Sequence, residues 1–149
     1  NKEVIIASSG EELAKHCDII VTTTPSRKAY FSPEWIHPGL HITSMGSDAE
    51  DKQELYAQVF SKADIIACDL VSQSTRLGEL RAPQAAGIIK DLSVVREIGD
   101  IIGGKKKGRV SDSEVSICDL TGVGVQDTVV AMMAYNIAKE KQLGLEVER

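Results

Sequence analysis

Short apolar runs constrain the fold of this chain more than any other feature of its sequence. Three of them read Asp-Ile-Ile-Val-Thr-Thr-Thr (18–24), Asp-Ile-Ile-Ala-Cys-Asp (64–69) and Glu-Val-Ser-Ile-Cys-Asp (114–119), and similar runs span 3–7 and 40–46. Strands buried on both faces are apolar at successive positions, whereas half-exposed strands alternate with polar residues. The runs therefore predict strands of a parallel sheet.

Helix-like segments separate the predicted strands. Ser9 is placed to cap a short helix, and residues 51–63 carry one apolar stripe at helical spacing. Residues 72–86 are helix-like but interrupted by Pro83, and the longest helix opens at Gly122. Strands that alternate with helices indicate an α/β, doubly wound parallel sheet of Rossmann type, in which ligands bind at the carboxyl ends of the strands.

Composition excludes several classes of partner. The 149 residues are 42% hydrophobic, and 17 basic against 22 acidic residues give a net charge of -5. An acidic chain of this kind is not expected to bind nucleic acid or an anionic membrane. A spanning helix needs roughly 20 consecutive apolar residues, and no run approaches that length. A small-molecule ligand remains the expectation.

The cysteines and histidines do not indicate a metal site or a disulfide. Cys17, Cys68 and Cys118 are widely spaced without a Cys-x-x-Cys motif, which is typical of reduced core residues in a cytoplasmic protein. His37 and His41 are four residues apart, but Pro38 and Gly39 between them prevent the helix that would place both rings on one face. We expect no metal.

Polar loops follow three of the predicted strands, at 22–26, 44–48 and 120–124, and we expect them to converge. Asp48 lies in the second loop with Lys52 four residues later, so the lysine would keep this carboxylate ionised for proton abstraction or for binding an ammonium group. The alternative is that Asp48 only caps a helix. The Gly-x-Gly-x-x-Gly cofactor motif is missing after the first strand.

Several motifs, taken in order, resemble the ornithine cyclodeaminase/mu-crystallin family. They cover nearly the whole chain, and together they are much more specific than any one of them alone. The matching segments are Val21-Thr-Thr-Thr-Pro-Ser-Arg-Lys28, Pro38-Gly-Leu-His-Ile-Thr-Ser-Met-Gly-Ser-Asp48, Lys52-Gln-Glu-Leu55, Gly78-Glu79, Glu97-Ile98-Gly99 with Gly104, and Asp119-Leu-Thr-Gly-Val-Gly-Val-Gln-Asp127.

The resemblance implies that the chain is a C-terminal fragment. Residues 1–143 would be the later part of an NAD(P)-binding Rossmann-type domain, including its long final helix, and 144–149 a tail. The first phosphate-binding βαβ half would be absent, and a start at Asn1 without an initiator Met agrees with this. We expect such a piece alone to be inactive and to self-associate.

Family positions imply roles for individual residues. The catalytic aspartate falls on Asp48, as general acid/base. The family position that binds substrate matches Thr121. The positions that bind the cofactor match Thr24, Ile42, Thr43, Ser44, Met45, Lys52 and Leu120.

The implied activity is that of an NAD-dependent ornithine cyclodeaminase, acting on an α-amino acid by hydride transfer, imine formation and loss of ammonia. NAD is favoured over NADP. An alanine dehydrogenase-like enzyme, an imine reductase and a mu-crystallin-like NADPH- and ligand-binding protein are the alternatives. The full-length protein would be a cytoplasmic homodimer.

Two positions depart from the family pattern. Ala49-Glu50-Asp51 stands where the enzymes have a Pro-Gly or Gly-Pro-Gly turn, and its two negative charges would suit a diamino acid. Leu120 stands where the family often has serine, so one hydrogen bond to cofactor or substrate would be lost.

Overall fold

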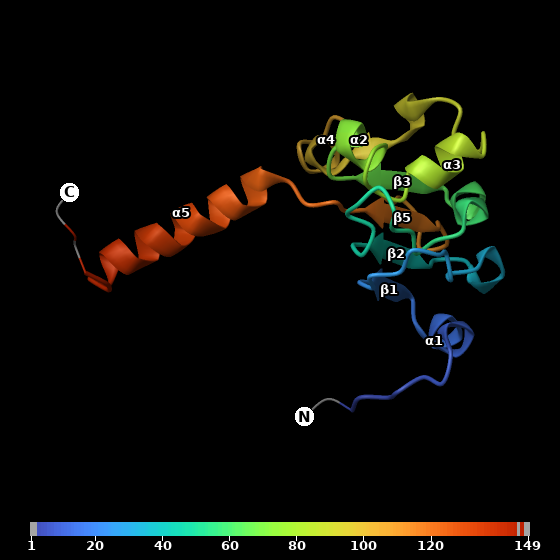
Figure 1. Cartoon of the computed structure of the whole chain (residues 1–149), viewed down its shortest axis with the longest axis horizontal. Coiled ribbons are helices and arrows are strands. Elements are labelled where there is room, and N and C mark those ends of the chain that lie inside the picture. The colour runs from blue at the N-terminus through green and yellow to red at the C-terminus, as the bar shows by residue number, and fades with distance from the viewer. Residues whose placement is uncertain (1–2, 146, 148–149) are drawn as a thin grey trace.

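A parallel five-stranded sheet forms the centre of the part described by this computed structural model, residues 3–145 and 147 (Figure 1). The strand order is β1-β2-β5-β3-β4, and neighbouring strands pair in parallel throughout. The strands are β1 (Ile19–Thr22), β2 (His41–Ser44), β3 (Ile65–Cys68), β4 (Arg96–Glu97) and β5 (Ser116–Asp119). This sheet confirms the predicted fold class, and four of its strands lie inside predicted runs.

Short helices connect the strands, and one long helix ends the described chain. They are α1 (Gly10–His16), α2 (Val71–Ser74), α3 (Arg81–Ala85), α4 (Ile98–Ile102) and α5 (Gly124–Glu140), with the 3-10 turns η1 (Pro33–Trp35), η2 (Ala57–Lys62) and η3 (Leu92–Val94). Ser9 caps α1 as predicted, because its hydroxyl accepts the Glu12 N–H at 3.1 Å. Among the described residues, no helix is long and apolar enough to cross a membrane.

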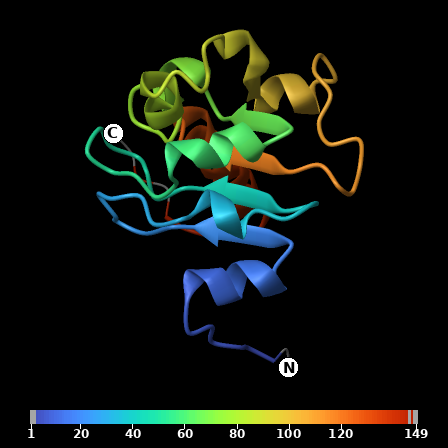
Figure 2. The same cartoon turned by 90° about the vertical axis from the view of Figure 1, so that its right-hand side faces the viewer.

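The core covers one face of the sheet. Ile20, Ile42 and Ile117 lie side by side on β1, β2 and β5 and are buried in one core cluster with Leu40 and Leu55. The opposite face is more open, since Ile19 and Val21 of β1 are exposed there. Figure 1 shows α5 extending away from the sheet, and in Figure 2, turned by 90°, it lies behind the sheet. None of its residues is buried.

The predicted strand at 3–7 is wrong. This segment forms no strand and lies beyond α1, away from the sheet (Figure 1). Val4, Ile5 and Ile6 are each more than four-fifths exposed. Its apolar sequence suits a strand, but in this structure β1 is the edge strand and 3–7 does not pair with it, so neither backbone partners nor burial stabilise an extended ladder here.

The predicted helix at 51–63 is also wrong over its first half. The carboxylate of Glu79 accepts the backbone N–H groups of Glu54 and Leu55, at 2.6 and 3.2 Å, so these groups are not available to a helix. Only η2 forms, at its end.

The helix-like segment 72–86 divides into two short helices, α2 and α3. Pro83 lies in the first turn of α3, where a missing N–H costs no hydrogen bond. Pro83 therefore belongs to the second helix, and the interruption lies before it.

The three cysteines are free thiols, as predicted; Cys68 is buried, and Cys17 and Cys118 are partly buried. Burial raises the pKa of Cys68 to about 12 and that of Cys118 to about 11, so both are protonated at neutral pH. Across residues 3–145 and 147, no cluster of three or more His, Cys, Asp or Glu side chains could hold a metal ion.

Candidate functional site

Two strand-end loops line one shallow hollow at the carboxyl edge of the sheet. Its volume is about 250 Å³. The loop after β1 contributes Thr23, Thr24 and Pro25, and the chain after β2 contributes Met45, Gly46, Asp48 and Lys52. The predicted meeting of these two loops is therefore confirmed.

Asp48 and Lys52 form an ion pair inside this hollow, with Lys52 Nζ 2.6 Å from Asp48 Oδ1. The hydrogen bond from the ammonium group lowers the pKa of Asp48, so the carboxylate is ionised at neutral pH. Residues 49–51 form a turn and no helix starts at Asp48, so the helix-cap alternative is wrong. The side chain of Asp48 is about half exposed and remains accessible to a ligand.

Six of the seven predicted cofactor residues divide into two groups. Thr24, Met45 and Lys52 line the hollow. Ile42 and Ser44 are buried instead, and Thr43 points to the other face of the sheet, where its hydroxyl is 3.0 Å from the ring of His41. Within β2, therefore, a ligand in this hollow could meet the backbone but not these three side chains.

The third predicted loop does not line this hollow. The N–H of Leu120 donates to the carbonyl of Ser44 at 2.8 Å, which places Leu120 directly beside the end of β2. The N–H groups of Thr121 and Gly122 donate to the carboxylate of Asp69, at 2.9 and 2.7 Å. Leu120 and Thr121 are thus held between the ends of β2 and β3.

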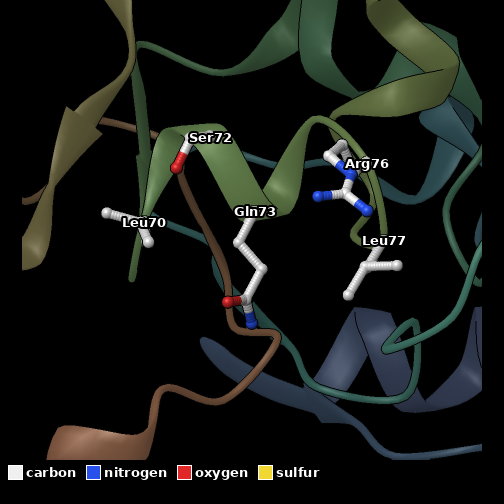
Figure 3. Close-up of a pocket in the computed structure, with 5 residues that line it drawn as sticks. All are labelled: Leu70, Ser72, Gln73, Arg76 and Leu77. Atoms are coloured by element: carbon white, nitrogen blue, oxygen red, sulfur yellow. The ribbon is translucent and has the colours of Figure 1, made fainter.

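Gln73 of α2 connects the third loop with a second hollow. Its side-chain amide donates to the hydroxyl of Thr121 at 2.9 Å. Figure 3 shows Gln73 extending from α2, with Arg76 and Leu77 on the segment that follows. The second hollow has a volume of about 190 Å³ and is lined by Leu70, Ser72, Gln73, Arg76 and Leu77.

Three buried carboxyl groups lie beneath the loops, and none of them was predicted as a site residue. Glu54, Glu79 and Asp119 are each at most 1% exposed. Burial raises the pKa values of Glu79 and Asp119 to about 7. One oxygen of Asp119 accepts the Leu80 N–H at 3.2 Å, and the other has no hydrogen-bond partner among the described residues.

The signal for two of these groups was present in the sequence. Glu54 and Glu79 belong to the motifs Lys52-Gln-Glu-Leu55 and Gly78-Glu79. Each glutamate directly precedes a leucine that is fully buried. Acidic residues beside core positions are rarely buried unless they are hydrogen-bonded, so they mark a polar network inside the fold.

A parallel sheet with ligand-accessible loops at its carboxyl edge is typical of doubly wound, Rossmann-type nucleotide-binding proteins. The sequence profile of the ornithine cyclodeaminase/mu-crystallin family matches residues 1–142. The chain belongs to this family, which confirms the resemblance drawn from its motifs.

Related proteins have several enzymatic names. An uncharacterised cyclodeaminase of Sinorhizobium fredii is 43% identical over 126 residues, which cover 85% of this chain and 38% of that protein. Alanine dehydrogenase of Archaeoglobus fulgidus is 41% identical over 137 residues, covering 92% and 42%. The crystal structure of iminosuccinate reductase of Paracoccus denitrificans in complex with NAD+ matches with a TM-score of 0.86 at 38% identity, covering 93% and 42%.

These matches agree on the extent of the common region. The chain spans about two fifths of the length of each of the three proteins. The TM-score of 0.86 shows that this chain shares its fold with the corresponding part of a protein crystallised in complex with NAD+.

Proposed function

We propose that the full-length protein containing this chain is an NAD(P)-dependent enzyme that acts on an α-amino or α-imino acid, with Asp48 as its general acid/base. The observation that carries the proposal is the ionised carboxylate of Asp48, held 2.6 Å from the Lys52 ammonium group in a hollow at the strand ends. The NAD+ complex of a relative that is 38% identical supports the cofactor, with NAD favoured over NADP.

The hollow fits one end of such a cofactor. Its volume of about 250 Å³ is below the roughly 300–1,000 Å³ of complete ligand pockets, so it suits a nicotinamide ring rather than a whole dinucleotide. Thr24, Met45 and Lys52 would hold the ring, with the backbone of Gly46 beside it. A bound nicotinamide cofactor would supply the acceptor and donor of hydride.

Asp48 would accept and donate the protons of the reaction. Oxidation of an amine to an imine removes a hydride from the α-carbon and a proton from nitrogen, and an ionised carboxylate can accept that proton. The same group can return a proton to the leaving ammonia. Lys52 keeps the carboxylate ionised and would bind the cofactor, while Leu120 and Thr121 would contact cofactor and substrate from the neighbouring loop.

The leading reaction is cyclisation of a diamino acid with loss of ammonia, as in ornithine cyclodeamination. Glu50 and Asp51 were expected to attract the second amino group. Asp51 instead forms an ion pair with Arg27, with Nε 3.1 Å from Oδ2, so its charge is already partly offset. Glu50 is then the better candidate for that attraction.

A simple amino-acid dehydrogenase or imine reductase is the second candidate, because two of the three relatives above have those names. Product analysis separates the reactions. Cyclodeamination of ornithine returns the hydride and gives proline with no net NADH. Dehydrogenation of alanine gives one NADH for each molecule oxidised.

Asp48→Asn in the full-length protein tests the role of the carboxylate. We expect turnover to fall by at least about 100-fold, the lower range for general acid/base catalysis, while NADH binding, measured by fluorescence titration, is retained. Asp91→Asn is the matched control, since Asp91 is an acid that caps η3. Retained turnover in Asp48→Asn would reject the catalytic role. NADH binding without turnover of any amino acid by the wild type would favour the ligand-binding alternative.

A further inference from the structure

The carboxylate of Glu54 lies directly beneath both loops of the hollow and accepts hydrogen bonds from each of them. We propose that Glu54 is the positioning residue of this site, and that its carboxylate sets the spacing between the loop after β1 and the loop after β2. The proposal deepens the proposed function and rests on it for the identity of the ligand.

Each carboxylate oxygen of Glu54 accepts hydrogen bonds mainly from one of the two strand ends. Oε1 accepts from the N–H and the hydroxyl of Thr24, at 2.6 and 2.7 Å, and from the hydroxyl of Tyr30 at 3.1 Å, all of which follow β1. Oε2 accepts from the N–H of Gly46 at 2.9 Å and the hydroxyl of Ser44 at 3.2 Å, and also from Thr22 at 2.6 Å. One side chain therefore joins the ends of both strands.

The arrangement favours an ionised carboxylate. The backbone N–H groups of Thr24 and Gly46 can only donate, so both oxygens must accept. Burial by itself would raise the pKa of Glu54, but the hydrogen bonds from Thr22, Thr24 and Gly46 outweigh burial and lower it. The carboxylate is charged at neutral pH, and such charge-assisted bonds are about twice as strong as neutral ones.

Glu54 is itself fixed by the core, so it can act as a reference point for the loops. Its N–H donates to the buried carboxylate of Glu79 at 2.6 Å, and its carbonyl accepts the N–H groups of Tyr30 and Phe31, at 2.9 and 3.0 Å. Leu55, the next residue, is fully buried. The loops, in contrast, include exposed residues: Thr23 and Pro25 after β1, and Met45 and Asp48 after β2.

Close packing at Gly46 restricts the positions that the two loops can adopt. A Cβ built on Gly46 would collide with the carbonyl oxygen of Thr24 and with the carboxyl group of Glu54. The backbones of the two loops therefore meet directly at this carboxylate, and a change in its hydrogen bonding must move at least one of them.

Glu54→Gln tests the proposal with almost no change in shape. Whichever way the amide is oriented, its NH2 group faces the N–H of either Thr24 or Gly46, and one backbone donor loses its acceptor. Loss of a charged acceptor costs roughly 10- to 100-fold in an equilibrium constant. In the full-length protein we expect faster amide hydrogen exchange in 22–28 or 44–48, and an NADH dissociation constant raised at least about tenfold.

Asp64→Asn is the matched control. Its carboxylate also accepts a backbone N–H, that of Val115 at 2.8 Å, but it lies before β3, at the opposite end of the strands from the hollow. We expect this variant to lose stability without a change in loop exchange or in the affinity for NADH. Thr22→Val serves if Glu54→Gln does not fold. It removes one donor to Oε2 without altering a residue that lines the hollow, and should give the same changes in smaller degree.

Unchanged loop exchange in Glu54→Gln, or in Thr22→Val where that variant replaces it, would overturn the proposal, as would faster exchange with wild-type affinity for NADH. If the wild-type protein does not bind NADH, the proposed function fails, and the positioning role is then decided by loop exchange alone. Faster exchange with weakened NADH binding, absent from Asp64→Asn, supports both.

Discussion

At the scale of single residues, Glu79 and Asp119 make the stability of the fold depend on pH in the opposite sense from most carboxyl groups. Burial raises the pKa of each to about 7, whereas the unfolded chain has carboxyl pKa values near 4. Between about pH 4 and pH 7 the folded state therefore binds more protons than the unfolded state. The free energy of unfolding contributed by these groups is largest below pH 4 and falls as the pH rises through 7.

Glu79→Gln should remove part of this pH dependence. The amide does not titrate, so the variant loses less stability than the wild type as the pH rises from 5 to 8, and Asp119 accounts for the loss that remains. The wild type loses on the order of a few kcal/mol over the same range. Thermal unfolding of the full-length protein at several pH values measures this difference. A wild-type melting temperature that rises steadily from pH 5 to pH 8, equally in both proteins, would contradict the assignment.

At the scale of elements, the meeting of the two loops can be tested at Gly46. In Gly46→Ala the new methyl group would collide with Thr24 and Glu54, and overpacking of this kind typically costs about 1–3 kcal/mol. We expect a lower melting temperature together with weaker NADH binding. Gly99→Ala in α4 is the control, because its Cβ would meet no atom within 4 Å. Equal behaviour of the two variants would show that the loops adjust freely.

Most of the strands, but not all of them, could be predicted from local sequence patterns. β1, β2, β3 and β5 were found because each lies in a short run of mainly apolar residues that is visible locally. Burial on both faces holds fully for β3 only, since Ile19 and Val21 of the edge strand β1 are exposed. The two-residue strand β4 leaves no such pattern. The ion pair of Asp48 with Lys52 was also expected, from a spacing of four residues on a helical turn, but it forms across a turn that is not helical.

Long-range contacts explain why the helix prediction at 51–63 was wrong and why the position of Glu54 was not predicted. Residues 51–56 have a helix-like apolar spacing, but the carboxylate of Glu79, 25 residues from Glu54 in sequence, takes the backbone groups that a helix would use. The position of Glu54 beneath both loops likewise depends on contacts with residues 32 and 30 positions away, Thr22 and Thr24. A local pattern contains no information about such partners.

At the scale of the whole molecule, α5 and the segment 3–7 present apolar surface to solvent. α5 is exposed along its length and has apolar side chains around most of its circumference: Val125, Val129, Val130, Met132, Met133, Tyr135 and Ile137. A helix that is apolar all round is normally buried. Exposed patches of this kind promote association.

The 149-residue chain expressed by itself should therefore form concentration-dependent oligomers. Val129→Lys combined with Met133→Lys places two charges one turn apart on α5 and should reduce this association, as measured by sedimentation velocity over a range of concentrations. Thr128→Lys with Asn136→Lys is the control, since it adds the same charge to α5 without removing an apolar side chain. Equal loss of association in both variants would assign the effect to net charge instead of apolar contact, and a wild-type chain that stays monomeric at every concentration would contradict the prediction altogether.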